Sequence, residues 1–166
     1  MRGLVLLGGY YFPTQRLDVW ASTPPAVPVV GDVMRYAIGP SVTRLIAKGI
    51  VRRWFAPRPV PKRFRARFPL DLALRPWQIR ASAEESAMMI PAVSEMRRRY
   101  KDLRCPVAIL AGAQDQVAIP SRHAVRLHRA IPDSTLKLSP NVGHMIHYYA
   151  HRDILDAVES VAERAG

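Results

Sequence analysis

Two short runs of apolar residues, separated by about a hundred positions, constrain what this chain can fold into. The first, "GLVLLG" at 3–8, is bounded by glycines, and the second, "VAILA" at 107–111, ends at Gly112. Continuous apolar runs of this length are typical of strands buried on both faces of a parallel sheet. A third, shorter run, "TLKL" at 135–138, follows the turn signal "IPDS". The sequence therefore predicts an α/β fold with about three parallel strands.

Two segments with helical periodicity accompany the last two strands. The segment 120–131 lies between them, with Ser121 as the expected N-cap, and 152–165 closes the chain. The expected apolar face of the second helix consists of Ile154, Leu155, Val158, Val161 and Ala162. Since parallel strands are joined by right-handed crossovers, we expect these helices to flank the sheet.

A long insertion separates the first two strands and differs from the rest of the chain in composition. Between positions 31 and 104 it holds 17 of the 25 basic residues but only 6 of the 13 acidic ones, and 10 of the 15 prolines lie between positions 14 and 104. Apolar residues repeat at helical spacing over 31–55 and 80–100, and Ser82 with Glu85 has the spacing of a capping box. We predict a first core strand in 1–13, a helical Pro- and Arg-rich cap in 14–104, and core strands and helices in 105–166.

Two side chains of chemical interest follow neighbouring strands. Asp115 lies in "LAGAQDQVAIP", just after the second strand, and His144 lies in "SPNVGHM", just after the third. Parallel sheets present their ligand sites at the carboxyl ends of the strands, so the two loops should face each other. A carboxylate that accepts a hydrogen bond from one imidazole nitrogen fixes the tautomer and prepares the other nitrogen to take a proton.

These motifs resemble the last two strands of the α/β-hydrolase fold family. In that family the acid precedes the histidine, and "PVAILAGAQDQVAIP" followed by "STLKLSPNVGHMIH" matches this order. The opening "RGLVLLGGYYFPT" is similar to the strand before the family's cap. The resemblance implies that Asp115 is the triad acid and His144 the general base. It also implies a carboxylesterase- or lipase-like hydrolase that acts on a small apolar ester by Ser-Asp-His acyl transfer.

The nucleophile of the family pattern is absent from this sequence. No G-x-S-x-G motif occurs, and the nearest string, "GPSVT" around Ser41, lacks the second glycine. The oxyanion loop is missing as well, and without both parts the Asp-His pair cannot carry out acyl transfer alone. We expect the acid–histidine half of a hydrolase, inactive without a further segment. The alternative is a non-catalytic fragment or binding protein that joins a missing amino-terminal half, or itself, along the first strand.

Other interpretations of the candidate residues stay open. Asp115 could simply be a turn residue, His144 could be a packing residue, and Asp18 is a reserve candidate for the acid. The spacing of His144, His147 and His151 is compatible with zinc, but no further strong ligand accompanies them. We expect no metal and no cofactor.

The basic insertion has three possible roles. Its aromatic and sulfur-containing side chains could form an apolar substrate pocket, for which the candidates are Trp54, Phe55, Trp77, Met88 and Met89. Arg75 or Arg80 could meet a substrate carboxylate. Arginines interleaved with aromatic residues in "VRRWFAPRPVPKRFRARF" could also contact an anionic membrane surface or nucleic acid. The sequence favours the solvated cap over a membrane role, and we expect no nucleic acid partner.

Localisation is inferred from cysteine content and hydropathy. Cys105 is the single cysteine, which excludes an internal disulfide and fits a reducing compartment. No apolar run approaches the roughly 20 residues of a membrane span. We therefore expect a cytoplasmic protein without a transmembrane helix.

Overall fold

A three-stranded parallel sheet forms the centre of the molecule. The computed structural model describes residues 2–14 and 40–166. The strand order is β1-β2-β3, with Leu4 opposite Val107 and Val107 opposite Ser134. The strands are β1 (Leu4–Leu7), β2 (Val107–Gly112) and β3 (Ser134–Ser139). The prediction of three parallel strands is therefore confirmed.

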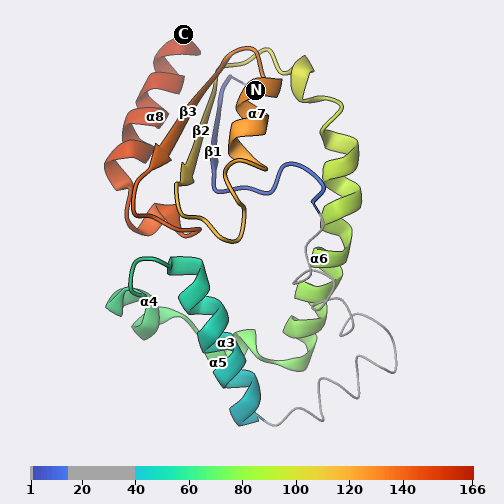
Figure 1. Cartoon of the computed structure of the whole chain (residues 1–166), viewed down its shortest axis with the longest axis vertical. Helices are drawn as coiled ribbons and strands as arrows, with labels where there is room; N and C mark the ends of the chain where they lie inside the picture. Colours follow the sequence, from blue (N-terminus) through green and yellow to red (C-terminus); the bar gives the residue numbers. More distant parts are fainter. Residues whose placement is uncertain (1, 15–39) are drawn as a thin grey trace.

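Helices flank the sheet and fill the insertion. In chain order, the helices of the described residues, with η marking 3-10 helices, are α3 (Pro40–Phe55), α4 (Lys62–Arg67), α5 (Leu70–Ala73), α6 (Pro76–Met96), η2 (Tyr100–Asp102), α7 (Ala124–Ala130), η3 (Ile146–Tyr148) and α8 (His151–Arg164). In Figure 1, α7 and α8 lie on opposite faces of the sheet, while α3, α4 and α5 lie beyond the ends to which the strands point. No helix of the described residues is long and apolar enough to cross a membrane.

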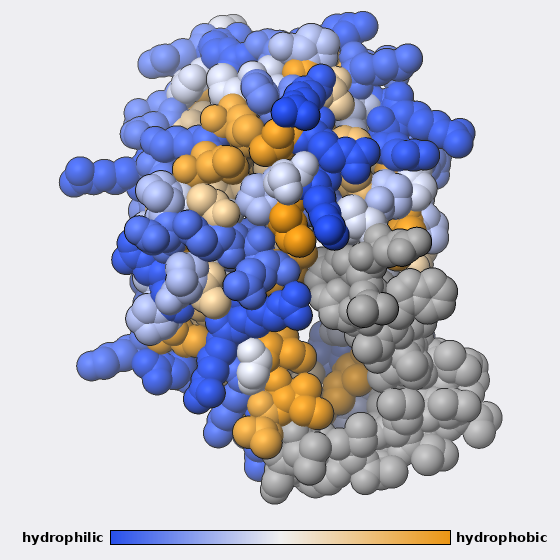
Figure 2. Space-filling view, viewed as in Figure 1, coloured by the Kyte–Doolittle hydropathy of each residue, from blue (hydrophilic) through white to orange (hydrophobic). Residues whose placement is uncertain are grey.

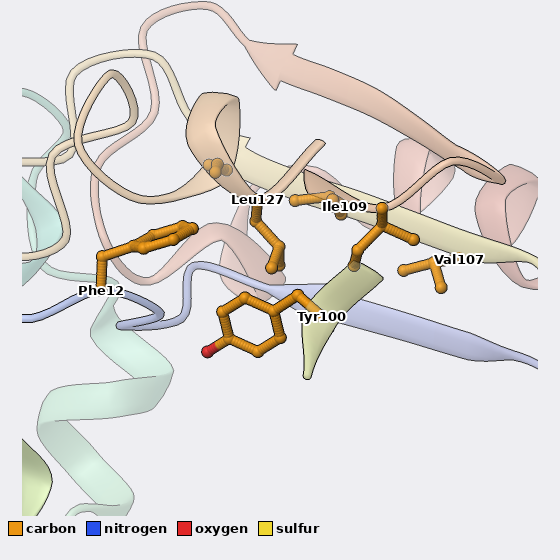
Figure 3. Packing of buried hydrophobic residues seen from close by; sticks show 8 residues of the cluster. Phe12, Tyr100, Val107, Ile109 and Leu127 are labelled. Atoms are coloured by element: carbon orange, nitrogen blue, oxygen red, sulfur yellow. The ribbon is translucent and has the colours of Figure 1, made fainter. Parts of the chain in front are cut away.

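The central strand β2 carries the core. All six of its residues are buried, and successive side chains alternate between two clusters, one on each face of the sheet. Figure 3 shows the cluster on the α7 side, where Val107 and Ile109 lie near Leu127, Tyr100 and Phe12. The other cluster packs Ala108 and Leu110 against η3 and α8. This double burial explains why the strand is a continuous apolar run.

The outer strands are less buried. In β1, Leu7 is 37% exposed and the other residues are half-buried, because β1 pairs only with β2 within the described part of the chain. In β3, half-buried and exposed residues alternate from Ser134 to Lys137, and Leu138 is also exposed, at 40%.

Two expectations about helix starts were wrong. Helix α7 begins at Ala124 after a turn that places His123, not Ser121, at the N-cap position. Helix α6 begins at Pro76, because proline suits the first helical turn, so Ser82 lies inside the helix and makes no capping box with Glu85.

The expected apolar face of α8 was also wrong in part. Ile154, Ala157 and Val161 pack toward the sheet, whereas Leu155 is 60% and Val158 47% exposed. A helix on a flat sheet buries only the stripe nearest to it, and these two residues lie beside that stripe.

Candidate active site

Asp115 sits in the turn directly after β2 and is fixed by three hydrogen bonds. Its Oδ1 accepts from the backbone N–H groups of Val117 at 2.7 Å and Ala118 at 2.9 Å. Its Oδ2 lies 2.9 Å from His144 Nδ1, and the side chain is fully buried. A buried carboxylate that accepts three hydrogen bonds keeps its position, which suits a group that must orient another.

His144 lies in the loop after β3 and faces Asp115. Because a carboxylate only accepts hydrogen bonds, Nδ1 must carry the proton that bridges the two residues. The other ring nitrogen, Nε2, has no hydrogen-bond partner among the described residues, and 28% of the side chain is exposed. This imidazole is therefore held at one nitrogen and available for proton transfer at the other.

Three glycines let the backbones around the pair approach closely. Gly8, at the end of β1, has φ +52°, and a Cβ there would lie 3.2 Å from His144 O and 3.9 Å from Asp115 Oδ2. A Cβ on Gly112 would lie 2.2 Å from Gly143 O, and one on Gly143 would lie 2.1 Å from Ala56 O. Gly8 thus lets the end of β1 approach the pair, Gly112 lets the end of β2 approach the histidine loop, and Gly143 lets that loop approach the end of α3.

The end of α3 closes against the histidine loop. Met145 N donates to Trp54 O at 3.1 Å, and Arg53 Nη2 donates to Gln116 O at 3.2 Å in the acid loop. Phe55 is buried to 1% exposure between Phe64 and Tyr148. Hydrogen bonds and aromatic contacts therefore join the inserted helices to both loops that carry the pair.

The five predicted pocket residues are not gathered into one place. Phe55 is buried and Trp54 half-buried at the end of α3, beside the histidine loop. On α6, Trp77 is 62% and Met88 71% exposed, and Met89 is half-buried. None of the five lines the groove between α3 and the segment Pro59 to Leu70, which is described below. Of the cations expected to meet a substrate carboxylate, Arg75 lies over Trp77 and Arg80 pairs with Glu84.

The remaining candidates lie away from the pair or outside the described residues. Ser41 is in the first turn of α3, and Asp18 lies outside the described ranges. Within residues 2–14 and 40–166, no group of three or more His, Cys, Asp or Glu is arranged to hold a metal ion. The pKa of His147 is lowered by partial burial and by the neighbouring His144 and His151.

Sequence reasoning missed two features near the site. Buried His123 accepts from the backbone N–H of Tyr11 at 3.2 Å and so fixes the segment that leaves β1. Gly8 lies against the pair. The only sequence signal for this close approach was the "GG" that follows the first strand.

Comparisons with known proteins support the fold. No family model matches the sequence, and no curated protein matches it. Solved structures do match, among them an esterase from Exiguobacterium antarcticum, with 21% identity and a TM-score of 0.65 over 97% of this chain and 57% of that one. A thermophilic esterase from Thermogutta terrifontis matches with 17% identity and a TM-score of 0.60, over 99% of this chain and 56% of that one.

An enol-lactonase from Burkholderia xenovorans LB400 is also similar, with 18% identity and a TM-score of 0.58, over 97% of this chain and 56% of that one. The chain spans about half the length of these proteins. All three have the α/β-hydrolase fold, and the chain has that fold in part, as its sequence predicted.

Proposed function

We propose that this part of an α/β-hydrolase fold supplies the acid and the general base of an ester-hydrolysing site. The observation that carries the proposal is the contact of Asp115 Oδ2 with His144 Nδ1 at 2.9 Å, between loops that follow neighbouring strands. The likeness to esterases supports hydrolase chemistry at the level of the fold.

The geometry of the pair suits acyl transfer. A serine oxygen attacks the ester carbonyl as His144 Nε2 takes its proton, and the same nitrogen then protonates the alcohol that leaves. Water repeats the sequence and releases the acid. Asp115 accepts the hydrogen bond from Nδ1–H and stabilises the imidazolium, while two backbone N–H groups fix its Oδ1.

The serine, in this proposal, comes from a polypeptide segment that pairs with the outer edge of β1. Neighbouring strands in a sheet lie about 4.8 Å apart, so a parallel strand beside β1 would end next to Gly8. Gly8 in turn lies against His144. A nucleophile on a turn after such a strand would therefore be within reach of His144 Nε2, and its backbone N–H groups could supply oxyanion donors.

The decisive experiment compares the chain alone with the chain joined to the segment encoded directly upstream of Met1. If that DNA encodes a strand followed by G-x-S-x-G, the joined protein should hydrolyse p-nitrophenyl butyrate. His144→Ala should abolish turnover, and Asp115→Asn should lower kcat by about 10³-fold or more through the wrong tautomer. The chain alone should be no faster than its own His144→Ala variant.

Two results would contradict the proposal. Rapid turnover by the chain alone that disappears in His144→Ala would show that no outside serine is needed. Turnover by the joined protein that survives His144→Ala would show that the histidine is not the base.

A second candidate function is favoured by the outer edge of β1, which pairs with no strand among residues 2–14 and 40–166 and where Leu7 is 37% exposed. In this alternative the chain associates along β1, with a partner chain or with itself, and catalyses nothing. Sedimentation analysis would then show an oligomer that Leu7→Lys weakens, while neither the chain nor the joined protein hydrolyses the ester.

A further inference from the structure

A groove within the insertion is separate from the Asp115–His144 pair. It lies between α3 and the segment from Pro59 to Leu70, which contains α4, and its cavity volume is about 700 Å³. Neither Asp115 nor His144 lines it. Cavities that hold small molecules have volumes of roughly 300–1,000 Å³, so the groove is large enough for one. We call it the α3–α4 groove.

One wall of the α3–α4 groove is apolar and firmly held. Phe64 stacks on Phe68, with ring centroids 4.7 Å apart and planes at 14°, and Val51 lines the opposite side from α3. Behind this wall, Phe55 contacts Phe64 at 5.0 Å and is itself buried. A wall supported from behind keeps its shape, so an apolar chain could be buried there at little cost in ordering side chains.

Three cations surround the same groove without acidic partners. Lys48 and Arg52 lie one turn apart on α3, and Arg65 projects from α4. Among the described residues none of the three forms an ion pair or a side-chain hydrogen bond. Two other arginines of the insertion have acidic partners: Arg44 pairs with Asp71 and Arg80 with Glu84. The positive charge at the groove is therefore uncompensated and complementary to an anion.

On the face shown in Figure 2, apolar side chains reach the surface in the lower half of the molecule among strongly hydrophilic ones. Figure 1 places α3 and α4 together in this half, beyond the carboxyl end of the sheet. Most of the excess basic residues of the chain also lie in the insertion.

We propose that the α3–α4 groove binds a medium-chain carboxylate, with its apolar chain against Phe64 and Phe68 and its carboxylate among Lys48, Arg52 and Arg65. An apolar wall alone would accept a neutral chain equally well, but three unpaired cations favour a charged head. This inference does not depend on the proposed function, because no part of the groove belongs to the acid–histidine pair.

Isothermal titration calorimetry with octanoate and 1-octanol tests the proposal. These probes share one chain length and differ in charge, and octanoate should bind at least about tenfold more tightly. Arg65→Gln should weaken octanoate binding by about tenfold, as expected for loss of a charge-assisted hydrogen bond, and should leave 1-octanol binding nearly unchanged. Arg63→Gln is the matched control, since it removes the same charge from the same helix at a position that does not line the groove.

A second variant tests the cavity itself. Val60 lines the groove, and Val60→Trp should narrow it and weaken octanoate binding while all three cations remain. Circular dichroism of each variant confirms that its helices are retained. Equal affinities for octanoate and 1-octanol, or equal losses in Arg63→Gln and Arg65→Gln, would overturn the proposal. So would binding to phosphatidylglycerol vesicles, equally affected by Arg63→Gln and Arg65→Gln, without binding of monomeric octanoate.

Discussion

Strand β2 and helix α6 are both rich in apolar residues, yet they are buried to very different extents. All six residues of β2 are buried, whereas α6, with 21 residues, buries only Ala83 and Val93. The strand has neighbours on both edges and helices over both faces, while most of the surface of α6 faces solvent. The core therefore holds the candidate catalytic pair rigidly, and the insertion offers surface for binding.

The two regions meet at the end of α3. There the backbones of Trp54 and Ala56 contact the loop from Gly143 to Met145, and Phe55 is buried against Tyr148. The core and the insertion are therefore in contact, because the end of α3 packs against one side of the histidine loop. Matched substitutions in the two regions can measure the difference.

The largest expected effect comes from adding one methyl group at a glycine in each region. Gly112→Ala should destabilise the chain by more than about 4 kcal/mol, because its Cβ would meet backbone atoms of Val142 and Gly143 that cannot move aside. A Cβ at Gly49 in α3 would have no atom within 4 Å, so Gly49→Ala should stabilise the folded chain by about 0.5–1 kcal/mol through helix propensity. Urea unfolding followed by circular dichroism gives the change in unfolding free energy for both variants. Similar destabilisation by Gly112→Ala and Gly49→Ala would contradict the difference in packing between core and insertion.

A smaller difference is expected between two aspartates. Asp115→Ala leaves the backbone N–H groups of Val117 and Ala118 and the Nδ1–H of His144 without an acceptor, so it should cost about 2–4 kcal/mol. Asp71→Ala removes only an ion pair with Arg44 in which the aspartate is 79% exposed, and should cost less than about 1 kcal/mol. The same unfolding assay compares them, and equal costs would show that Asp115 is not held as described.

The smallest expected effect is the dependence of stability on pH that His147 causes, close to where the core meets the insertion. Burial and two neighbouring histidines lower the pKa of His147 below its ordinary value of 6.5. The unfolded chain then binds more protons than the folded chain as the pH falls through 6.5, so stability should decrease there. His147→Gln should reduce this decrease between pH 7.5 and 5.5 in urea midpoints. An unchanged or steeper decrease in the variant would contradict the lowered pKa.

Much of the fold was predictable because its signals are local. The strands were placed within one or two residues, since the apolar runs end at or next to glycine, proline or turn residues, which favour the end of a strand. Helix starts were less predictable. The turn before α7 is set by His123, which accepts hydrogen bonds from backbone N–H groups more than a hundred residues away. A cap assigned from neighbouring residues could not include that contact.

The insertion shows the limit of sequence reasoning most clearly. Its composition indicated apolar and basic binding surface, but the side chains expected to line a pocket are mostly exposed or packed elsewhere. The groove is lined instead by residues such as Val51 and Phe68, which come together only because α4 folds back onto α3. Helical periodicity shows which residues share one helix face, but not which second helix will cover it.

By itself, the sequence determined the parallel sheet and the placement of Asp115 and His144 after adjacent strands, because both follow from short-range apolar patterns and from the direction of parallel strands. Only the tertiary structure decided that Oδ2 of one meets Nδ1 of the other, that Gly8 lies against them, and that three cations surround one apolar groove. These contacts join residues far apart in the chain, and their distances depend on how strands, loops and helices pack rather than on any local pattern.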